Sequence, residues 1–473
     1  MIKLILIAST IAIIIIFFLG VFFVAQCSTP KPTVEVSRQY ALIDESIEIS
    51  ISSLAVHEEI SIEASCKDKD NNTWKSCVKF QADDNGVVNL TKQAPISGTY
   101  KGIDPMGLFW SMVAPNKETP IFFADDNKNV QEVVLSVLSQ NKLKEQKIIY
   151  RLLVSPDVES ISIREPGIVG KLFYPKNLRN GPGVITIPGS DGGIHERISK
   201  ILASRGYAVF SLGYFGLDGL PETLENIHLE YFQNAMRWFK EQPQVAVDRV
   251  ALFGQSIGGE LALILASMFP KEMTSVIAGV PAGIVYGGFP HLDKPCWFYK
   301  NVPLSFIPLY PCDNPTPDTK EILEAVRAGK ITYHAGSYED PFDYSPVFLL
   351  GMDVFHKNIE AATIPVENIT CSVLLLSGDK DMVWPATLYS QLVMKRLDEK
   401  HSTIKRAHRH FANAGHCFLY PYTPYMPVAS QPIFYPNEDQ WTSFGGTPEG
   451  NAYANRESWK EVLEFLSETL SNK

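Results

Sequence analysis

A serine between two glycines is the clearest sign of chemistry in this sequence. Gly254-Gln255-Ser256-Ile257-Gly258 has the pattern G-x-S-x-G; the apolar run Val250–Phe253 precedes it and an apolar helical stretch follows. In that context, small residues at positions 254 and 258 allow a sharp strand-to-helix turn that exposes the serine hydroxyl. We therefore predict Ser256 as a nucleophile, the alternative being an incidental Gly/Ser turn. The N–H of Ile257 is a predicted donor to the oxyanion.

A serine hydroxyl is a weak nucleophile and needs a base and an orienting acid. After a G-x-S-x-G turn these partners follow in the order Ser, Asp, His. Asp381 lies just beyond an apolar strand that begins at Ser372, and His416 lies in a later loop. We predict Asp381 as the acid and His416 as the base. Asp379 is the competing acid, but a short Asp beside Gly more commonly holds a turn.

Two further histidines, His408 and His410, lie in a polar segment that we assign to a solvated strand end. A zinc site formed by these two and His416 is an alternative. No acidic or Cys ligand with a familiar spacing accompanies them. We therefore predict neither a metal nor a cofactor.

The loop Pro188–Gly193, with the sequence PGSDGG, is the predicted source of a second oxyanion donor. Glycines let backbone N–H groups approach a substrate oxygen closely. Ser190 and Asp191 are the nearest candidates, and the sequence does not choose between them.

The elements that must position these residues alternate between apolar strands and helices beyond about Arg151. Such alternation is typical of a mostly parallel sheet covered by helices on both faces. The predicted strands are Gly183–Ile187, Ala208–Leu212, Arg249–Phe253, Ser275–Ala278 and Ser372–Leu376, and the predicted helices are Ile194–Ser204, Leu224–Glu241, Ile257–Phe269, Ala386–Leu397 and Ala454–Leu470. The predicted fold class is α/β, an α/β-hydrolase domain over residues 149–473.

Residues 29–148 show a different rhythm, with short alternating runs such as Ser46–Ile51 and Glu59–Ala64 separated by turn clusters. A period of two with frequent turns indicates an antiparallel β-sandwich. We predict an N-terminal immunoglobulin-like β-sandwich domain. Between Pro281 and Asp353 the alternation of strands and helices stops, and the sequence is rich in Pro and aromatic residues. This stretch is either a lid or a wall of the substrate pocket, or else an ordered surface excursion.

Residues 1–28 form an apolar N-terminus in which Leu4–Ala25 carry no charge. The stretch is long enough to span a bilayer. We predict an uncleaved membrane anchor, with Lys3 on the cytoplasmic side and the catalytic body extracytoplasmic, periplasmic or lumenal. A cleaved signal segment or a lipid-modified Cys27 are the alternatives.

Composition and charge narrow the functional classes. The 473 residues are 45% hydrophobic and 20% charged, which is typical of a folded protein of two or three domains. A net charge of -10 and the lack of a Lys/Arg-rich block argue against nucleic-acid binding. For an exported body, the pairs Cys66–Cys77 and Cys296–Cys312 are candidate disulfides, and small buried hydrophobes are the alternative.

The sequence resembles the family of acyl-CoA thioesterases and bile acid-CoA:amino acid N-acyltransferases over nearly everything after the apolar N-terminus. The resemblance rests on Gly98–Trp110, Gly170–Pro175, Pro188–Gly193, Tyr214-Phe215-Gly216 with Leu220-Pro221, and His228–Phe232.

The resemblance implies a Ser or Cys nucleophile that attacks the thioester carbonyl of an acyl-CoA, with Ser256, Asp381 and His416 as the triad. For the acyltransferase branch of the family, the resemblance implies a Cys at the nucleophile position. Ser256 at that position therefore implies hydrolysis to a free acid and a thiol, by way of an acyl-enzyme. Cys417 is assigned to packing. The rival hypotheses are an extracytoplasmic carboxylic-ester or lipid hydrolase and a non-catalytic binding protein.

Overall fold

A computed structural model describes residues 31–113, 122, 124–125, 128–165, 167–308, 336–424, 430–435 and 440–471 of the protein. The predicted membrane anchor, with its alternatives at Cys27, lies outside these residues. Among the residues that are described, no helix has the length and apolar character needed to cross a bilayer.

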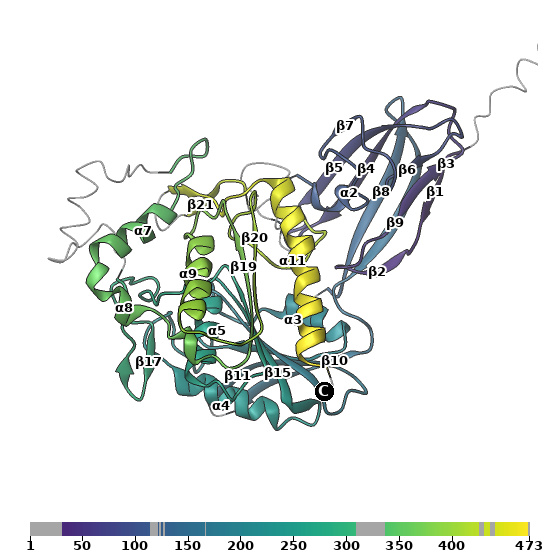
Figure 1. The fold of residues 1–473 in the computed structure, drawn as a ribbon. Coiled ribbons are helices and arrows are strands. Elements are labelled where there is room, and N and C mark those ends of the chain that lie inside the picture. The colour runs from purple at the N-terminus through teal and green to yellow at the C-terminus, as the bar shows by residue number, and fades with distance from the viewer. Residues whose placement is uncertain are drawn as a thin grey trace, which may run out of the picture.

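An eight-stranded sheet forms the centre of the larger region (Figure 1). Its strand order is β10-β11-β13-β12-β15-β16-β19-β20, and only β11 is antiparallel to both of its neighbours. The first two strands make a hairpin that the sequence patterns did not predict. The strands are β10 (Val158–Glu165), β11 (Ile168–Pro175), β12 (Gly181–Ile187), β13 (Ala208–Gly213), β15 (Val245–Gln255), β16 (Ser275–Gly279), β19 (Ser372–Gly378) and β20 (Arg406–Phe411).

Helices cover both faces of this sheet, as the alternating pattern predicted. The two helices α3 and α11 contact the same face, through hydrogen bonds from Ser199 to Thr186 and from Thr469 to Ser275. The helices α4, α5 and α9 contact one another directly or through η2 (Val366–Asn368) and cover the other face. The helices are α3 (Glu196–Ser204), α4 (Leu229–Lys240), α5 (Ile257–Met268), α7 (Ser345–Val354), α8 (Ile359–Ala362), α9 (Ala386–Glu399) and α11 (Pro448–Thr469).

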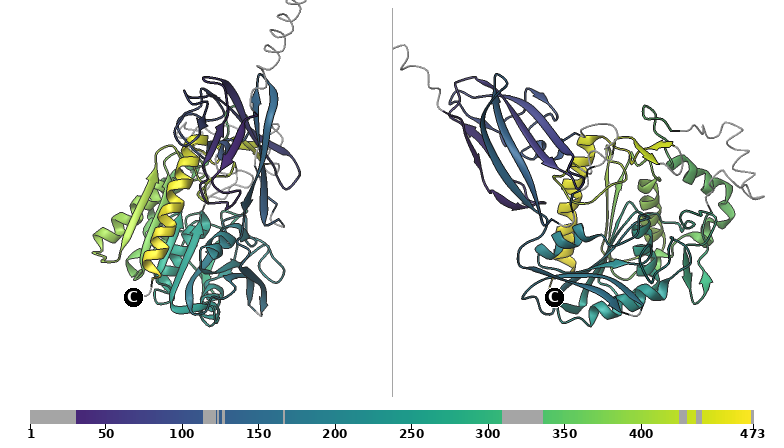
Figure 2. Two further views of the ribbon diagram at one scale, coloured as in Figure 1. Left: turned by 90° about the vertical axis from the view of Figure 1, so that its right-hand side faces the viewer. Right: turned by 180° about the vertical axis from the view of Figure 1, so that it is seen from behind.

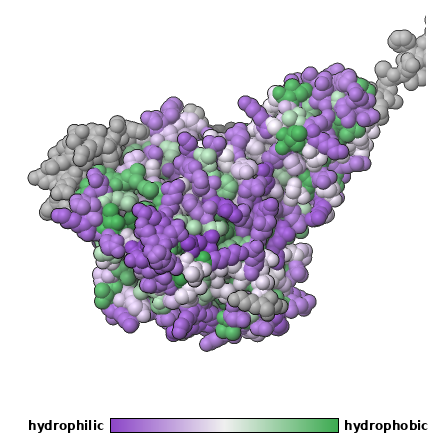
Figure 3. Space-filling model, viewed as in Figure 1, coloured by the Kyte–Doolittle hydropathy of each residue, from purple (hydrophilic) through white to green (hydrophobic). Residues whose placement is uncertain are grey.

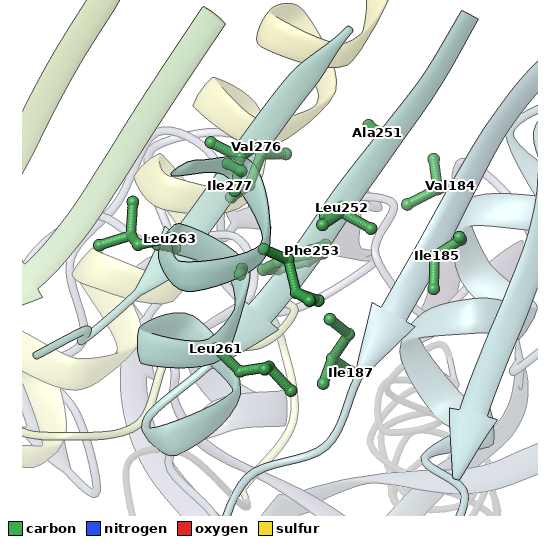
Figure 4. Close-up of a cluster of buried hydrophobic side chains, with 14 of the residues drawn as sticks. Val184, Ile185, Ile187, Ala251, Leu252, Phe253, Leu261, Leu263, Val276 and Ile277 are labelled. Atoms are coloured by element: carbon green, nitrogen blue, oxygen red, sulfur yellow. The ribbon is translucent and has the colours of Figure 1, made fainter. Parts of the chain in front are cut away.

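The core of this region lies where the central strands meet α5. Apolar side chains of β12, β15 and β16 form one buried cluster with those of that helix, and Figure 4 shows Ile187, Leu252 and Leu261 among them. Strands buried on both faces carry continuous apolar runs, which is why their pattern does not alternate. The serine turn therefore lies between the buried second half of β15 and α5, which is buried from Ile257 to Ser267.

The smaller region consists of two sheets around a core of its own (Figures 1 and 2). The strands β4 and β5 alternate strictly between buried and exposed side chains, as the period of two predicted. One sheet contains β1 (Thr33–Val36), β3 (Ile49–Ser52) and β6 (Val88–Asn89); the other contains β2 (Tyr40–Leu42), β9 (Lys142–Leu152), β8 (Val130–Ser139), β4 (Glu59–Lys67), β5 (Thr73–Gln81) and β7 (Ser97–Gly98). The immunoglobulin-like topology stays a prediction, as do the domain boundaries. Strand β9 continues past residue 148 to Leu152.

Asp44 connects the two regions. Its carboxylate is fully buried and accepts hydrogen bonds from Arg205 Nη2 at 2.9 Å and Nε at 3.1 Å. The indole N–H of Trp459 on α11 donates to the same carboxylate at 2.9 Å. A buried charge is tolerated when it is paired and hydrogen-bonded in this way. The β-sandwich is thus joined to the end of α3 and to the middle of α11.

The disulfide predicted between Cys66 and Cys77 is wrong. Both are free thiols, because Cys66 faces the core from β4 while Cys77 faces solvent from β5. Side chains of opposite parity on paired strands point to opposite faces of the sheet and do not meet. The other candidate partner, Cys312, lies outside the described residues.

Part of the Pro281–Asp353 stretch, before residue 309, lies in the core. Ala282, Tyr286 and Trp297 are buried and pack in the main hydrophobic cluster, which a mere surface excursion would not do. The small strand β17 (Trp297–Tyr299) pairs with β14 (Ile227–His228) on one side and with β18 (Val302–Pro303) on the other. Apolar surface is visible in the region of α7 (Figure 3), where Leu349 is exposed.

Candidate active site

Ser256 lies at the turn between β15 and α5 with a backbone φ of 57° and ψ of -128°. A non-glycine residue with positive φ is uncommon and costs free energy, so the surrounding structure must hold it. The Ser256 N–H donates to Gly279 O at 2.9 Å. A Cβ on Gly254 would lie 2.0 Å from Gly258 O, and one on Gly258 would lie 2.5 Å from Pro188 O. Only glycine fits at both positions, and this explains the spacing in G-x-S-x-G.

The structure brings the three predicted side chains together in one hydrogen-bonded chain. His416 Nε2 lies 2.9 Å from Ser256 Oγ, and His416 Nδ1 lies 2.7 Å from Asp381 Oδ2. The side chains of His416 and Asp381 are 7% and 2% exposed. A buried carboxylate on Nδ1 orients an imidazole so that Nε2 can accept a proton from the hydroxyl.

Backbone amides hold the Asp381 carboxylate in place. Its Oδ1 accepts the N–H of Val383 at 2.8 Å and that of Trp384 at 3.1 Å, which leaves Oδ2 for His416. The turn before it is tight, since a Cβ on Gly378 would lie 2.3 Å from Gly415 O. The acid loop and the His416 loop are therefore in direct backbone contact.

Trp384 supports the acid and the base from one position. Its indole N–H donates to Val280 O at 2.9 Å, and its ring meets the His416 imidazole edge to face at a centroid distance of 5.7 Å. No role was predicted for this residue. Its position three residues after Asp381 was the available signal.

Phe444 contacts His416 through both its backbone carbonyl and its ring. The His416 N–H donates to Phe444 O at 2.7 Å, and the two rings stack at a centroid distance of 6.3 Å. A Cβ on Gly415 would lie 2.2 Å from Phe444 O, so the glycine before His416 permits this close approach. Phe444 was also missed, because no local pattern links it to a histidine 28 residues earlier.

The Pro188–Gly193 loop passes beside Ser256. A Cβ on Gly189 would lie 3.6 Å from Ser256 Cβ, and the loop turns through a hydrogen bond from Gly192 N to Gly189 O at 3.3 Å. Within the described structure, the amides of Ser190 and Asp191 donate to no protein acceptor. Ile257 is the first residue of α5, where an N–H has no partner within the helix. Three candidate oxyanion donors thus remain free.

The other His and Asp candidates form a separate cluster. His408 Nε2 lies 2.8 Å from Ser377 Oγ, and His410 Nδ1 lies 3.1 Å from both carboxylate oxygens of Asp379. Thr387 Oγ1 lies 2.9 Å from Asp379 Oδ1. The assignment of His408 to a solvated strand end is wrong in part, because burial lowers its pKa to about 4. The described residues contain no cluster of metal-ligating side chains.

Cys417 follows the proposed base directly. Burial raises the pKa of its thiol well above the ordinary value. A thiol held protonated is a poor nucleophile, which agrees with a packing role.

Two family profiles match the chain. The Acyl-CoA thioester hydrolase/BAAT N-terminal region matches residues 44–165, and the BAAT/Acyl-CoA thioester hydrolase C-terminal region matches residues 227–298 and 345–472. The second match contains Ser256, Asp381 and His416.

Curated relatives are similar along most of their length. Mouse acyl-coenzyme A thioesterase 5 is 27% identical over 90% of this chain and 94% of its own. Human mitochondrial acyl-coenzyme A thioesterase 2 is 29% identical over 90% of this chain and 82% of its own. Mouse bile acid-CoA:amino acid N-acyltransferase is 27% identical over 91% of this chain and 96% of its own.

Similarity to solved structures is weaker. The α/β hydrolase GrgF from Penicillium sp. sh18 is 16% identical, with a TM-score of 0.37 over 66% of this chain and 99% of that one. An arylesterase is 14% identical, with a TM-score of 0.38 over 67% and 86%. TM-scores below 0.5 do not establish a shared function. The two family profiles and the full-length relatives do establish kinship, and the chain belongs to the acyl-CoA thioester hydrolase/BAAT family of serine-hydrolase-type enzymes.

Proposed function

We propose that the chain is an acyl-CoA thioester hydrolase that releases a free fatty acid and coenzyme A. The observation that carries the proposal is the pair of hydrogen bonds that links Ser256, His416 and Asp381. The substrate class is supported by the names of the relatives, of which several are acyl-coenzyme A thioesterases.

In the proposed mechanism, His416 Nε2 removes the Ser256 proton while Oγ bonds to the thioester carbonyl carbon. Asp381 stabilises the imidazolium that results. The C–S bond then breaks, and the thiolate of coenzyme A takes the proton from His416. Water, deprotonated by His416, attacks the acyl-enzyme, and the acid leaves as Ser256 regains its proton.

The negative charge that develops on the carbonyl oxygen needs donors that are already in place. The Ile257 N–H is one proposed donor, and the amide of Ser190 or Asp191 is the other. Their lack of protein partners supports this role, because donors fixed before reaction stabilise the oxyanion without reorganisation.

Hydrolysis is favoured over acyl transfer by the nucleophile. The family resemblance associates acyl transfer to an amino acid with Cys, and this chain has Ser at position 256. Relatives of both kinds are equally similar in sequence, so the choice rests on this residue.

A carboxylic-ester hydrolase outside the cytoplasm is the second candidate. The uncharged stretch Leu4–Ala25 favours it, because a membrane-anchored, outward-facing enzyme would meet little acyl-CoA.

The test compares thiol release from acyl-CoAs of increasing chain length with hydrolysis of matched esters, using purified protein and a Ser256→Ala control. Serine-dependent turnover of the thioesters, with an optimum chain length, supports the first proposal. Turnover of the esters alone would replace it with the second.

A further inference from the structure

Two buried asparagines on α11 hold the loop that carries His416. Asn451 and Asn455 lie one helical turn apart, and each is 1% exposed. Asn451 Oδ1 accepts the N–H of Gly415 at 2.9 Å, and Asn451 Nδ2 donates to Gly445 O at 3.1 Å. Asn451 therefore binds both the residue before His416 and the segment that follows Phe444.

Asn455 binds the same loop on the other side of His416. Its Oδ1 accepts the N–H of Leu419 at 2.7 Å, and its Nδ2 lies 3.2 Å from Cys417 O and 2.8 Å from Asn451 O. Together the two side chains satisfy backbone groups at positions 415, 417 and 419. The base is thus bracketed by hydrogen bonds to one rigid helix.

Asparagine has the hydrogen-bonding groups that both positions require. Each position must offer an acceptor to a backbone N–H and a donor to a backbone C=O, and an uncharged carboxamide supplies both. The loop lies outside regular secondary structure, so no strand or helix partner is present for these groups. A spacing of four residues places both carboxamides on one face of α11.

We propose that Asn451 and Asn455 are positioning residues for His416, and this rests on the proposed thioester hydrolysis. They touch neither the imidazole nor Ser256. They fix the backbone so that His416 Nε2 stays within reach of Ser256 Oγ. A small displacement of a base lowers the rate of the chemical step more than it weakens substrate binding.

The experiment uses Asn451→Leu and Asn455→Leu, which keep approximate side-chain size and remove both hydrogen-bonding functions. Ser458→Ala is the matched control, because Ser458 lies on the same helix, is equally buried, and its hydroxyl bonds only to the Asn455 carbonyl of α11. For each variant, kcat and KM for an acyl-CoA, the rate of Ser256 labelling by a fluorophosphonate, and Tm are measured.

We expect kcat to fall by about 10- to 100-fold in both Leu variants, with KM within about twofold of the wild-type value. The labelling rate should fall in parallel, and Ser458→Ala should change neither. A kcat within twofold of wild type, or a loss of kcat no larger than that of Ser458→Ala at an equal loss of Tm, would overturn the proposal.

If a Leu variant does not fold, the Ala variant at the same position takes its place, since it also removes both hydrogen-bonding functions and adds no charge; unchanged kcat in that variant would also overturn the proposal. The proposed function fails separately. A wild-type protein that releases no thiol but is labelled at Ser256 would refute thioester hydrolysis, while the labelling rates would still test the two asparagines.

Discussion

Two sets of Ser, His and Asp residues lie near the carboxyl ends of strands of the central sheet, and in only one of them does the carboxylate bind the same histidine that binds the serine. Ser256 lies on a turn with positive φ and contacts His416, which contacts Asp381. Ser377 lies inside β19, fully buried, and contacts His408. In the second set the carboxylate binds a different histidine from the one that binds the serine.

The difference shows that backbone geometry, more than residue type, makes a nucleophile. The hydroxyl of Ser377 projects from a face of the sheet, where it has His408 of β20 and Thr387 of α9 as partners. The turn at Ser256 instead places the hydroxyl at the start of α5, beside free amides. Substitutions in the two sets should therefore have very different effects on activity.

Removal of the serine hydroxyl should give the largest contrast. Ser256→Ala should lower kcat for an acyl-CoA by about 10⁴-fold or more, because no other group can carry the acyl intermediate. Ser377→Ala should leave kcat within about threefold of wild type. Steady-state thiol release measures both, and comparable losses in the two variants would remove the distinction.

The carboxylates should differ almost as much. Asp381→Asn should lower kcat by about 10³- to 10⁴-fold, because the amide favours the wrong imidazole tautomer. Asp379→Asn, which alters only the contact with His410 and Thr387, should change kcat by less than about threefold. If Asp379→Asn were the more damaging change, the assignment of the acid would be reversed.

The turn itself can be broken without touching a reacting group. Gly254→Ala places a Cβ 2.0 Å from Gly258 O, so the turn must shift, and we expect kcat to fall by about 100-fold. Gly206→Ala is the control, because Gly206 has a positive φ of 100°, so Ala strains the backbone there, but its Cβ meets no other atom. It should lower Tm and leave kcat unchanged. Equal kcat in the two variants would show that the serine turn tolerates displacement.

Trp384→Phe should have a smaller effect. The ring that packs on His416 is kept in part, while the hydrogen bond to Val280 O is lost. A buried carbonyl left without its partner costs about 1–3 kcal/mol of stability. We expect kcat to fall by about three- to tenfold. Chemical denaturation measures the loss of stability. An unchanged free energy of unfolding would argue against the importance of this bond.

The smallest effect should come from His408 and should appear only in the pH dependence of stability. Its pKa in the folded state, about 4, is below the ordinary value of 6.5, so the unfolded chain binds the proton first as pH falls. The stabilisation is thus complete above about pH 6.5 and is lost between pH 6.5 and 4. Denaturation of wild type and His408→Gln across this range should show a weaker pH dependence in the variant. Parallel curves would contradict the assignment.

The sequence predicted the parts of the fold that local pattern controls. Buried strands such as β12 and β16 carry continuous apolar runs, and the predicted bounds were close to the observed ones. Helix α11 begins six residues before the predicted Ala454, since Thr447 caps it and Pro448 occupies its first turn. The hairpin of β10 and β11 was missed because most of β10 is exposed and lacks an apolar run.

The site was predictable to the extent that each residue had a motif or a fixed chain order. Ser256, Asp381 and His416 were named on that basis, and the structure brings them together. Trp384, Phe444 and the two asparagines were not predicted, because their roles depend on contacts across the fold. For the asparagines, the signal available was two carboxamides spaced four residues apart, but Asn451 lay outside the predicted helix Ala454–Leu470.

The most direct test of the account is to locate the acyl group during turnover. The protein is mixed with a long-chain acyl-CoA, the reaction is quenched in acid within one turnover, and the peptides are examined by mass spectrometry. We predict an acyl group on the peptide that contains Ser256, absent in Ser256→Ala. An acyl group on another residue, such as Cys417, or full thiol release by Ser256→Ala, would contradict the account.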